Sequence, residues 1–264
     1  MHTTESDGRW TPARVVEQAA ARGVRVLALT DHDTTSGCAE AEAQATGVRV
    51  IAGVEINAEW PTGEAHVLGY FAQPGHAELQ TALGELRVRR RQRAQAIVSR
   101  LNETGVPLSM EQVQAQSGVA AIGRLHIARA LVAGQWANTP QDAFDLYLGV
   151  GRPAFVPRYA LTPQQAIALV RKAGGVASLA HPVRSGCEAH VAALVDAGLN
   201  ALEVYYFDHS AEDVARLSAV AERWGLLRTG GSDFHLWRKD GRRGIGSVWV
   251  PEADAERLLA VLGL

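Results

Sequence analysis

The sequence of 264 residues predicts an α/β fold in which polar side chains gather where buried strands end. The apolar run Leu27-Ala28-Leu29 leads into Thr30-Asp31-His32-Asp33, and the run from Val176 to Leu179 leads into His181. Buried parallel strands have continuous apolar runs of this kind rather than alternating patterns. In α/β folds chemistry collects at the ends of such strands, so both runs indicate a functional site.

Helices and strands alternate on both sides of a long middle segment. Thr11 is a suitable N-cap and Pro12 a suitable first residue for a helix that continues to Ala21. Apolar runs bounded by glycine or polar residues predict the strands, and amphipathic stretches predict the helices. The predicted elements are, in order, helix 12–21, strand 25–29, helix 38–45, strands 48–54 and 66–71, helix 163–172, strand 176–179, helix 188–197, strand 201–205, helix 211–224, strand 226–229 and helix 253–262.

The middle of the chain has a different pattern. A charged helix is predicted over 79–103, and shorter helices follow it. We therefore expect three parts: an α/β part at 1–75, an inserted helical cap at 76–150 and a second α/β part at 151–264. Arginines crowd residues 87–93, which would suit a phosphate backbone, but a solvated helix face balanced by Glu78 and Glu85 is the favoured interpretation.

Composition is typical of a globular protein. Hydrophobic residues make up 47% of the chain, and a net charge of −2 gives no overall basic field for long nucleic acids. Cys38 and Cys187 form neither a CxxC motif nor a disulfide framework, which favours a reducing compartment. No apolar run is long enough for a membrane span, and no signal peptide is recognisable. We expect a cytoplasmic protein with no membrane contact and no stable partner protein.

Histidines and carboxylates recur beside the apolar runs. Taken alone, Asp31 to Asp33 fits a turn with a helix-capping aspartate as well as it fits a metal site. The same mixture recurs at His2 and Asp7, at Glu55, at His66, at His181, and at Asp233 and His235. Divalent metals bind this combination of imidazole and carboxylate, so the full pattern favours a site that holds several metal ions.

On these motifs the chain resembles the PHP superfamily, named for polymerase and histidinol phosphatase and related to the amidohydrolases. The matching motifs are His2 to Gly8, Thr30-Asp31-His32-Asp33, Gly53-Val54-Glu55, His66, Ala180-His181-Pro182 and Ser232-Asp233-Phe234-His235. The resemblance extends along essentially the whole length. It implies a distorted (β/α)7 barrel with an inserted helical cap.

Within that superfamily the chain is similar to the branch that removes the 3′-phosphate from nucleoside 3′,5′-bisphosphates. Some members of the branch also trim short RNA from the 5′ end. The motifs for the branch are Gly123-Arg124-Leu125-His126-Ile127-Ala128-Arg129, Gly174-Gly175-Val176, and Glu203-Val204-Tyr205-Tyr206 through His209-Ser210. The resemblance implies a metal-dependent phosphoesterase that acts on a nucleotide or a short oligonucleotide. The alternatives are a histidinol-phosphate phosphatase and a metal-poor remnant that binds nucleotides without catalysis.

The resemblance also implies up to three divalent metal ions, with Mn²⁺ expected first and Fe²⁺ or Zn²⁺ as alternatives. The first motif of the family is His-x-His, and His2 matches its second histidine, so we expect the first histidine and its strand upstream of Met1. The implied ligand groups are His2, Glu55 and Asp233 for the first ion; Glu55, His66 and His181 for the second; and Asp7, His32 and His235 for the third.

Substrate contacts are expected from basic residues. The candidates are Arg124, His126, Arg129, Arg158 and Arg184. The guanidinium groups of the arginines match phosphate oxygens well. Asp31 is a candidate catalytic residue that orients a metal-bound histidine, a role that Asp33 could share. His209 or His126 is expected to protonate the leaving oxygen.

Overall fold

The computed structural model describes residues 1–60, 63–117, 122–159, 161–235 and 243–264. They form two compact units: Met1–Ala82 together with Ala160–Leu264, and Leu83–Tyr159. The expected helical insertion was 76–150. The boundary falls later because the first turns of helix α3 (Ala77–Glu103) belong to the first unit, where Leu79 is buried and Glu78 pairs with Lys172 at 2.6 Å.

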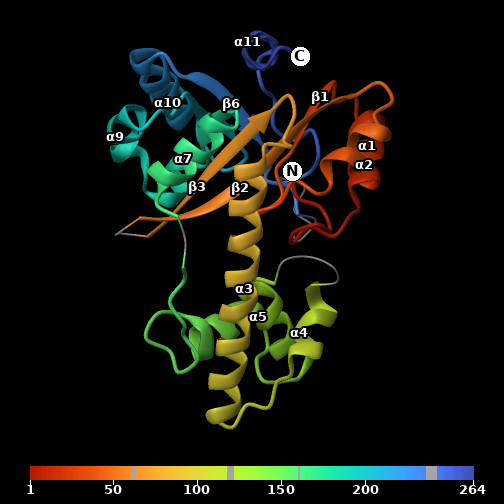
Figure 1. Ribbon diagram of the computed structural model, residues 1–264, viewed down its shortest axis with the longest axis vertical. Coiled ribbons are helices and arrows are strands. Elements are labelled where there is room, and N and C mark those ends of the chain that lie inside the picture. Colours follow the sequence, from red (N-terminus) through yellow and green to blue (C-terminus); the bar gives the residue numbers. More distant parts are fainter. Residues whose placement is uncertain (61–62, 118–121, 160, 236–242) are drawn as a thin grey trace. The chain divides into compact units, whose positions relative to one another are not determined.

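The first unit contains one curled, six-stranded mixed sheet that forms a half-barrel (Figure 1). The strands lie in the order of the chain: β1 (Val26–Leu29), β2 (Arg49–Trp60), β3 (Gly63–Phe71), β4 (Val176–Leu179), β5 (Ala201–Tyr206) and β6 (Leu227–Gly231). Strand β3 is antiparallel to both of its neighbours, and the other pairs are parallel. The described residues thus contribute six strands, against the seven that the resemblance implies.

Strand β2 is much longer than the predicted strand 48–54. It forms a hairpin with β3, and the pairing continues from Ala52 opposite Phe71 to Trp60 opposite Gly63. Backbone pairing therefore carries the strand past Glu55, where the polar side chain suggested its end. As a result, Glu55 and Asn57 lie within a continuous strand and have fixed directions.

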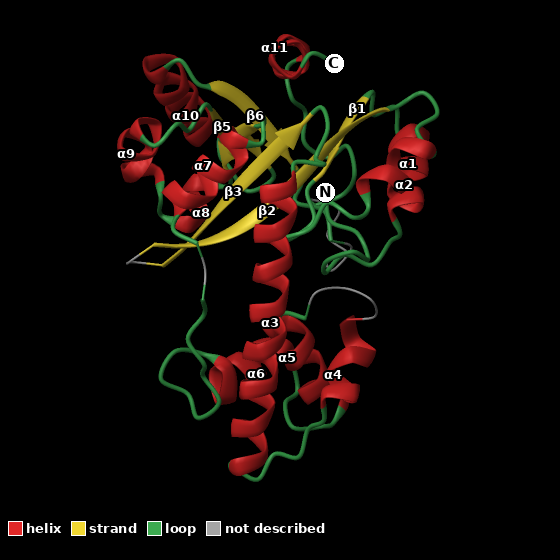
Figure 2. Cartoon of the chain, in the orientation of Figure 1, coloured by secondary structure: helices red, strands yellow, loops and turns green. Residues whose placement is uncertain are grey.

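Helices flank the sheet of the first unit (Figure 2). They are α1 (Pro12–Ala21), α2 (Cys38–Ala43), α7 (Pro163–Lys172), α8 (Pro182–Ser185), α9 (Val191–Asp196), α10 (Ala211–Trp224) and α11 (Glu252–Leu262), with a 3₁₀ turn η2 (Glu188–His190). The prediction of a single α-helix over 188–197 is wrong, because the first three residues form a 3₁₀ turn before α9 begins. In that turn the His190 amide donates to the Cys187 carbonyl, three residues earlier. Apolar side chains of α1 and β1, including Val15, Val16 and Leu29, share one buried cluster.

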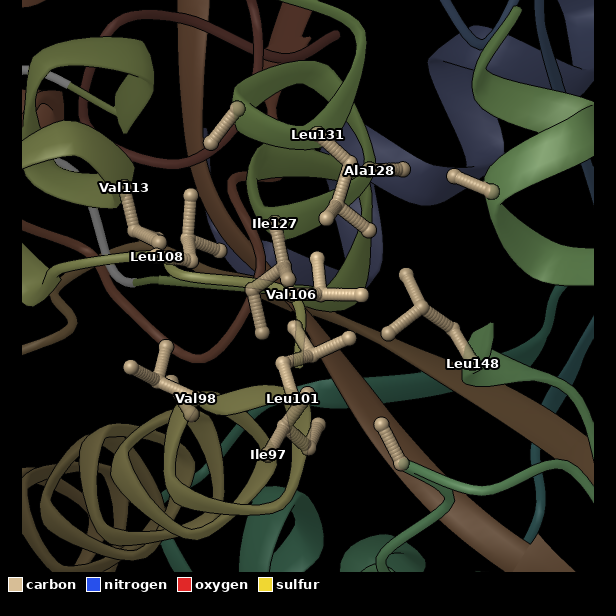
Figure 3. Packing of buried hydrophobic residues seen from close by; sticks show 14 of the residues in the cluster. Ile97, Val98, Leu101, Val106, Leu108, Val113, Ile127, Ala128, Leu131 and Leu148 are labelled. Atoms are coloured by element: carbon tan, nitrogen blue, oxygen red, sulfur yellow. The ribbon is translucent and has the colours of Figure 1, made fainter. Parts of the chain in front are cut away.

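In its described residues the second unit consists of helices joined by loops and contains no β-strand. After α3 it contains α4 (Met110–Ser117), α5 (Arg124–Ala133), α6 (Pro140–Ala143) and the π-helix η1 (Phe144–Leu148). Its own core includes Ile97, Leu101, Ile127 and Leu131, whose side chains point toward one another (Figure 3). None of the helices in the described ranges is long and apolar enough to cross a membrane.

Candidate metal centre

The loop before α1 is held to the end of β1 by Asp31. Its carboxylate accepts hydrogen bonds from the Thr3 amide (2.7 Å), the Thr3 hydroxyl (2.7 Å) and the Ser6 hydroxyl (2.5 Å). Asp31 is buried, and these donors occupy both of its oxygens. The geometry favours a role in which Asp31 positions the loop that carries His2 and Asp7.

A tight turn closes this loop. The Gly8 amide donates to the Thr3 carbonyl at 3.0 Å, and a Cβ at Gly8 would lie only 2.4 Å from the His2 carbonyl oxygen. Any larger residue would therefore have to push the backbone beside His2 away. The local sequence Thr3 to Gly8 thus fixes where the His2 imidazole lies.

His32 and Asp33 follow β1 and pair with β2. The Asp33 amide donates to the Glu55 carbonyl, and the Glu55 amide donates to the Asp31 carbonyl, each at 3.0 Å. Asn57, two residues beyond Glu55, lies with its side-chain nitrogen 3.0 Å from His32 Nδ1, and its backbone amide donates to Asp33 Oδ1 at 3.2 Å. Asn57 was not predicted as a site residue, yet it orients the His32 ring.

Glu55 lies at the centre of the site and is buried. Its Oε1 is 2.5 Å from His66 Nδ1 and 3.4 Å from His181 Nε2, and its Oε2 is 3.0 Å from His2 Nε2. The same His2 nitrogen is 3.3 Å from Asp233 Oδ1. The two oxygens of one carboxylate therefore face two different sets of partners.

The third expected group also assembles. His235 Nε2 is 3.2 Å from Asp7 Oδ1, and the His2 and His235 rings stack with their centroids 3.9 Å apart. In the described part of the chain, potential ligand atoms within 4.8 Å of one another form three sets: His2, Asp7, His32 and His235; Glu55, His66 and His181; and His2, Glu55 and Asp233. These sets contain every ligand inferred from the resemblance and add His2 to the third.

The membership of His2 in two sets limits what it can do. A neutral imidazole has one nitrogen with a lone pair, so His2 can bind an ion of only one set at a time. Its Nε2 faces Glu55 and Asp233, whereas its Nδ1 is 3.8 Å from Asp7. The shorter contacts favour the set with Glu55 and Asp233.

Three residues of the site have left-handed backbone conformations that are uncommon outside glycine. They are Asp33, with φ +53°, His181, with φ +30°, and Asp233, with φ +49°. Gln135 is the other non-glycine residue of this kind in the described chain. Such strain persists where surrounding contacts impose it and is frequent at functional sites. Here the three residues follow the ends of β1, β4 and β6.

Buried charges shift the pKa values of the cluster. Burial disfavours the charged form of His2, but hydrogen bonds to Asp233 and Glu55 outweigh it and raise its pKa to about 10. Burial opposes ionisation of Glu55, but His32, His66 and other imidazoles hold the pKa of this carboxyl well below its usual range. Without metal, protonated His2 thus compensates part of the buried negative charge of Glu55 and Asp233.

The donor set fits divalent cations. Atoms that surround one ion at about 2.1 Å lie about 3.0–3.4 Å from one another, which is close to the separations between Glu55, His2, His181 and Asp233. In addition, His2 Nδ1 and Asp7 Oδ1 are buried and have no hydrogen-bond partner, although buried polar atoms are normally satisfied. A cation near these atoms would remove that cost.

A cavity of about 760 Å³ adjoins this cluster. His2, Glu55, His181 and Asp233 line it together with apolar residues such as Leu68. The potential ligands are therefore accessible from a space within the first unit.

Glu203 is a further buried carboxylate, which the sequence analysis included in a motif but did not predict as a site residue. It belongs to β5, and its Oε2 accepts the His181 backbone amide at 2.7 Å. Burial raises the pKa of Glu203 to about 7, whereas the nearby His181 acts in the opposite direction. A lone carboxylate inside the apolar strand 201–206 was the signal that could have revealed it.

The remaining predicted residues lie in different units. Arg184 and His209 belong to the first unit, near the cluster. Arg184 donates from Nη1 to the Tyr206 hydroxyl at 3.5 Å, and His209 Nδ1 contacts the Val204 carbonyl at 2.9 Å. Arg124, His126, Arg129 and Arg158 belong to the second unit, where His126 Nδ1 accepts the Gly123 amide at the start of α5. Their substrate contacts remain predictions.

Comparison with known proteins decides the family. The PHP domain matches residues 1–117. The 5′-3′ exoribonuclease Rnm of Escherichia coli is 34% identical over 98% of this chain and 95% of its own length. The chain belongs to the PHP domain family. A 3′,5′-nucleoside bisphosphate phosphatase of Chromobacterium violaceum is 33% identical over 92% of this chain and 88% of its own length.

Solved structures agree with this assignment to the PHP family. A protein of Bifidobacterium adolescentis, whose name places it among metal-dependent phosphoesterases, is 32% identical with a TM-score of 0.87, covering 98% of this chain and 94% of its own. The predicted family and the predicted class of hydrolase are thereby confirmed. This PHP protein is a phosphoesterase whose His, Asp and Glu groups can hold divalent metal ions.

Proposed function

We propose that this chain removes the 3′-phosphate from nucleoside 3′,5′-bisphosphates with the help of divalent metal ions. The observation that carries the proposal is the shared position of Glu55, whose two oxygens face separate histidine sets. One carboxylate can then neutralise two adjacent cations, an arrangement suited to in-line phosphoryl displacement. The relative named as a 3′,5′-nucleoside bisphosphate phosphatase supports this choice of substrate.

The metal ions would supply Lewis acidity and a hydroxide nucleophile near neutral pH. His2 and Asp233 would hold one ion with Glu55, and His66 and His181 would hold a second with the other oxygen of Glu55. Asp7, His32 and His235 would hold a third. Asp31 positions the loop that carries His2 and Asp7, and Asn57 orients His32.

Arg184 and His209 would act on the substrate. Arg184 carries a fixed positive charge close to Tyr206 and can neutralise charge on phosphoryl oxygens. The His209 Nδ1 hydrogen bond to the Val204 carbonyl leaves Nε2 for proton transfer. We assign the Nε2–H of the protonated His209 imidazole as the group that gives a proton to the leaving ribose oxygen.

The second candidate function is trimming of short RNA from its 5′ end, which the relative named 5′-3′ exoribonuclease favours. The two activities differ in the bond that is cleaved, a terminal monoester or an internal diester. The arginines of the helical unit would serve either substrate by binding a second phosphate, as predicted from the sequence.

Phosphate release by the purified chain tests the proposal. The substrates are a nucleoside 3′,5′-bisphosphate, a nucleoside 3′-monophosphate, a 5′-phosphorylated oligoribonucleotide and histidinol phosphate, each with Mn²⁺ and with a chelator. We expect the highest kcat/KM for the bisphosphate, with the activity abolished by the chelator. A preference for histidinol phosphate, or activity that survives the chelator, would overturn the proposal.

A further inference from the structure

A group of basic and aromatic side chains lies beside the predicted metal ligands without belonging to their sets. We call it the Tyr206 cluster, and it consists of Arg184, Tyr206, Phe207, His209 and Arg243. All five belong to the first unit. Arg243, Tyr206 and Phe207 were not predicted as site residues from the sequence.

Tyr206 connects this cluster to the ligand sets. Its hydroxyl donates to Asp233 Oδ2 at 3.0 Å and accepts from Arg184 at 3.5 Å. Its ring centroid is 5.5 Å from that of His181 and 5.2 Å from that of His209. Tyr206 is buried, so these partners meet around a fixed phenol.

Arg243 reaches the same carboxylate from another segment. Its guanidinium lies over the Phe207 ring, 4.2 Å from the centroid, and its Nη1 is 3.8 Å from Asp233 Oδ2. The side chain is only 17% exposed. The N–H donors of a guanidinium lie in its plane. Because the Phe207 ring covers one face of the group, it fixes the orientation of that plane and so the directions of the donors.

Two buried polar atoms of the cluster have no hydrogen-bond partner among the residues that the structure describes. They are Arg243 Nε and His209 Nε2. The buried Nε–H of Arg243 without an acceptor is costly, and the 3.8 Å separation of Arg243 Nη1 from Asp233 Oδ2 is too long for a hydrogen bond. An anion with several acceptor oxygens would satisfy it.

We propose that the Tyr206 cluster is a phosphoryl-binding subsite in which Arg243 is the main ligand and Arg184 the second. This inference rests on the proposed function, because it names the residues that would receive the phosphoryl group beside the metal ligands. A planar guanidinium can donate two parallel hydrogen bonds to two oxygens of a phosphate monoester, whereas an ammonium group acts as a point charge without this fork geometry. In this arrangement Asp233 Oδ1 faces the metal ligand His2, and Asp233 Oδ2 accepts the hydrogen bond from the Tyr206 hydroxyl.

Direct binding of inorganic phosphate to the Mn²⁺-loaded chain tests this subsite by calorimetry. The variants are Arg243→Gln, Arg243→Lys and Arg184→Gln, and the control is Arg14→Gln, which removes an exposed arginine of α1 that pairs with Glu17. Elemental analysis measures bound Mn²⁺ in each variant. Loss of a charged hydrogen-bond partner should weaken phosphate binding about 10–100-fold in Arg243→Gln. A smaller loss is expected in Arg243→Lys and none in the control.

Two results would overturn the inference. Phosphate affinity could be unchanged in Arg243→Gln, or bound Mn²⁺ could fall in parallel with phosphate affinity, which would mean that Arg243 only orients Asp233. The metal content should instead stay at the wild-type value. A wild-type chain that binds phosphate but releases none from the bisphosphate would overturn the proposed function and leave the subsite supported.

Discussion

Glu55→Gln should disrupt the centre more than any other single substitution, because one carboxylate serves two ligand sets. Glu55 is 3% exposed, and its oxygens lie 2.5 to 3.4 Å from three histidines. Replacing a residue that merely orients a metal ligand costs about 10–100-fold in affinity or activity, so losing this shared ligand should cost at least about 100-fold.

The same substitution has a consequence in the metal-free chain. His2 is fully buried and has its pKa raised to about 10 by Asp233 and Glu55 against the effect of burial, so at neutral pH it is a buried cation. Removal of one partner from a buried ion pair typically costs about 3–5 kcal/mol of unfolding free energy. We expect a loss toward the lower end of that range, because Asp233 remains beside His2.

The assays are urea unfolding in the presence of a chelator and calorimetric titration with Mn²⁺. Glu59→Gln is the matched control, because Glu59 belongs to the same strand β2 and its side chain is exposed. Full metal stoichiometry at unchanged affinity in Glu55→Gln, with unfolding free energy equal to that of the control, would refute the reasoning.

Four further predictions concern the same centre. Binding of Mn²⁺ should release protons and tighten as pH rises from 6 toward 9, because the raised pKa of His2 keeps this ligand protonated in the metal-free chain. Calorimetric titrations in buffers of different ionisation enthalpy measure the proton release. Binding that does not depend on pH would contradict this prediction. Because the pKa of His2 is raised from 6.5 to about 10, protonated His2 stabilises the metal-free chain fully below about pH 6.5, and this stabilisation is lost as pH rises through about 10. Urea unfolding across that pH range measures the loss. Glu203→Leu leaves the His181 amide without its acceptor and should cost about 1–3 kcal/mol and lower the Mn²⁺ content, whereas Glu203→Gln keeps an acceptor oxygen and should retain most of both. Gly8→Ala should displace His2 and reduce Mn²⁺ affinity, while Gly75→Ala, where a Cβ meets no atom within 4 Å, should leave it unchanged.

The sequence predicted the elements with clear local signals. Helices α1, α7 and α10 begin where expected because Thr11, Thr162 and Ser210 each cap the helix with a side-chain oxygen. The length of β2 could not be predicted in this way, since it depends on pairing with β3 rather than on its own residues.

The same distinction applies to the site. His32, His181 and His235 were recognisable because they follow apolar runs. Asn57 and Glu203 were not, because they lie inside strands and their importance comes from partners distant in the sequence. The boundary of the helical unit was also misplaced by several residues, because one continuous helix belongs to both units.

A crystal of the Mn²⁺-loaded chain, measured at the manganese absorption edge, would test the shared role of Glu55 most directly. We expect anomalous peaks on both sides of the Glu55 carboxylate, one beside His2 and Asp233 and the other beside His66 and His181. A single peak, or peaks that do not contact Glu55, would contradict it.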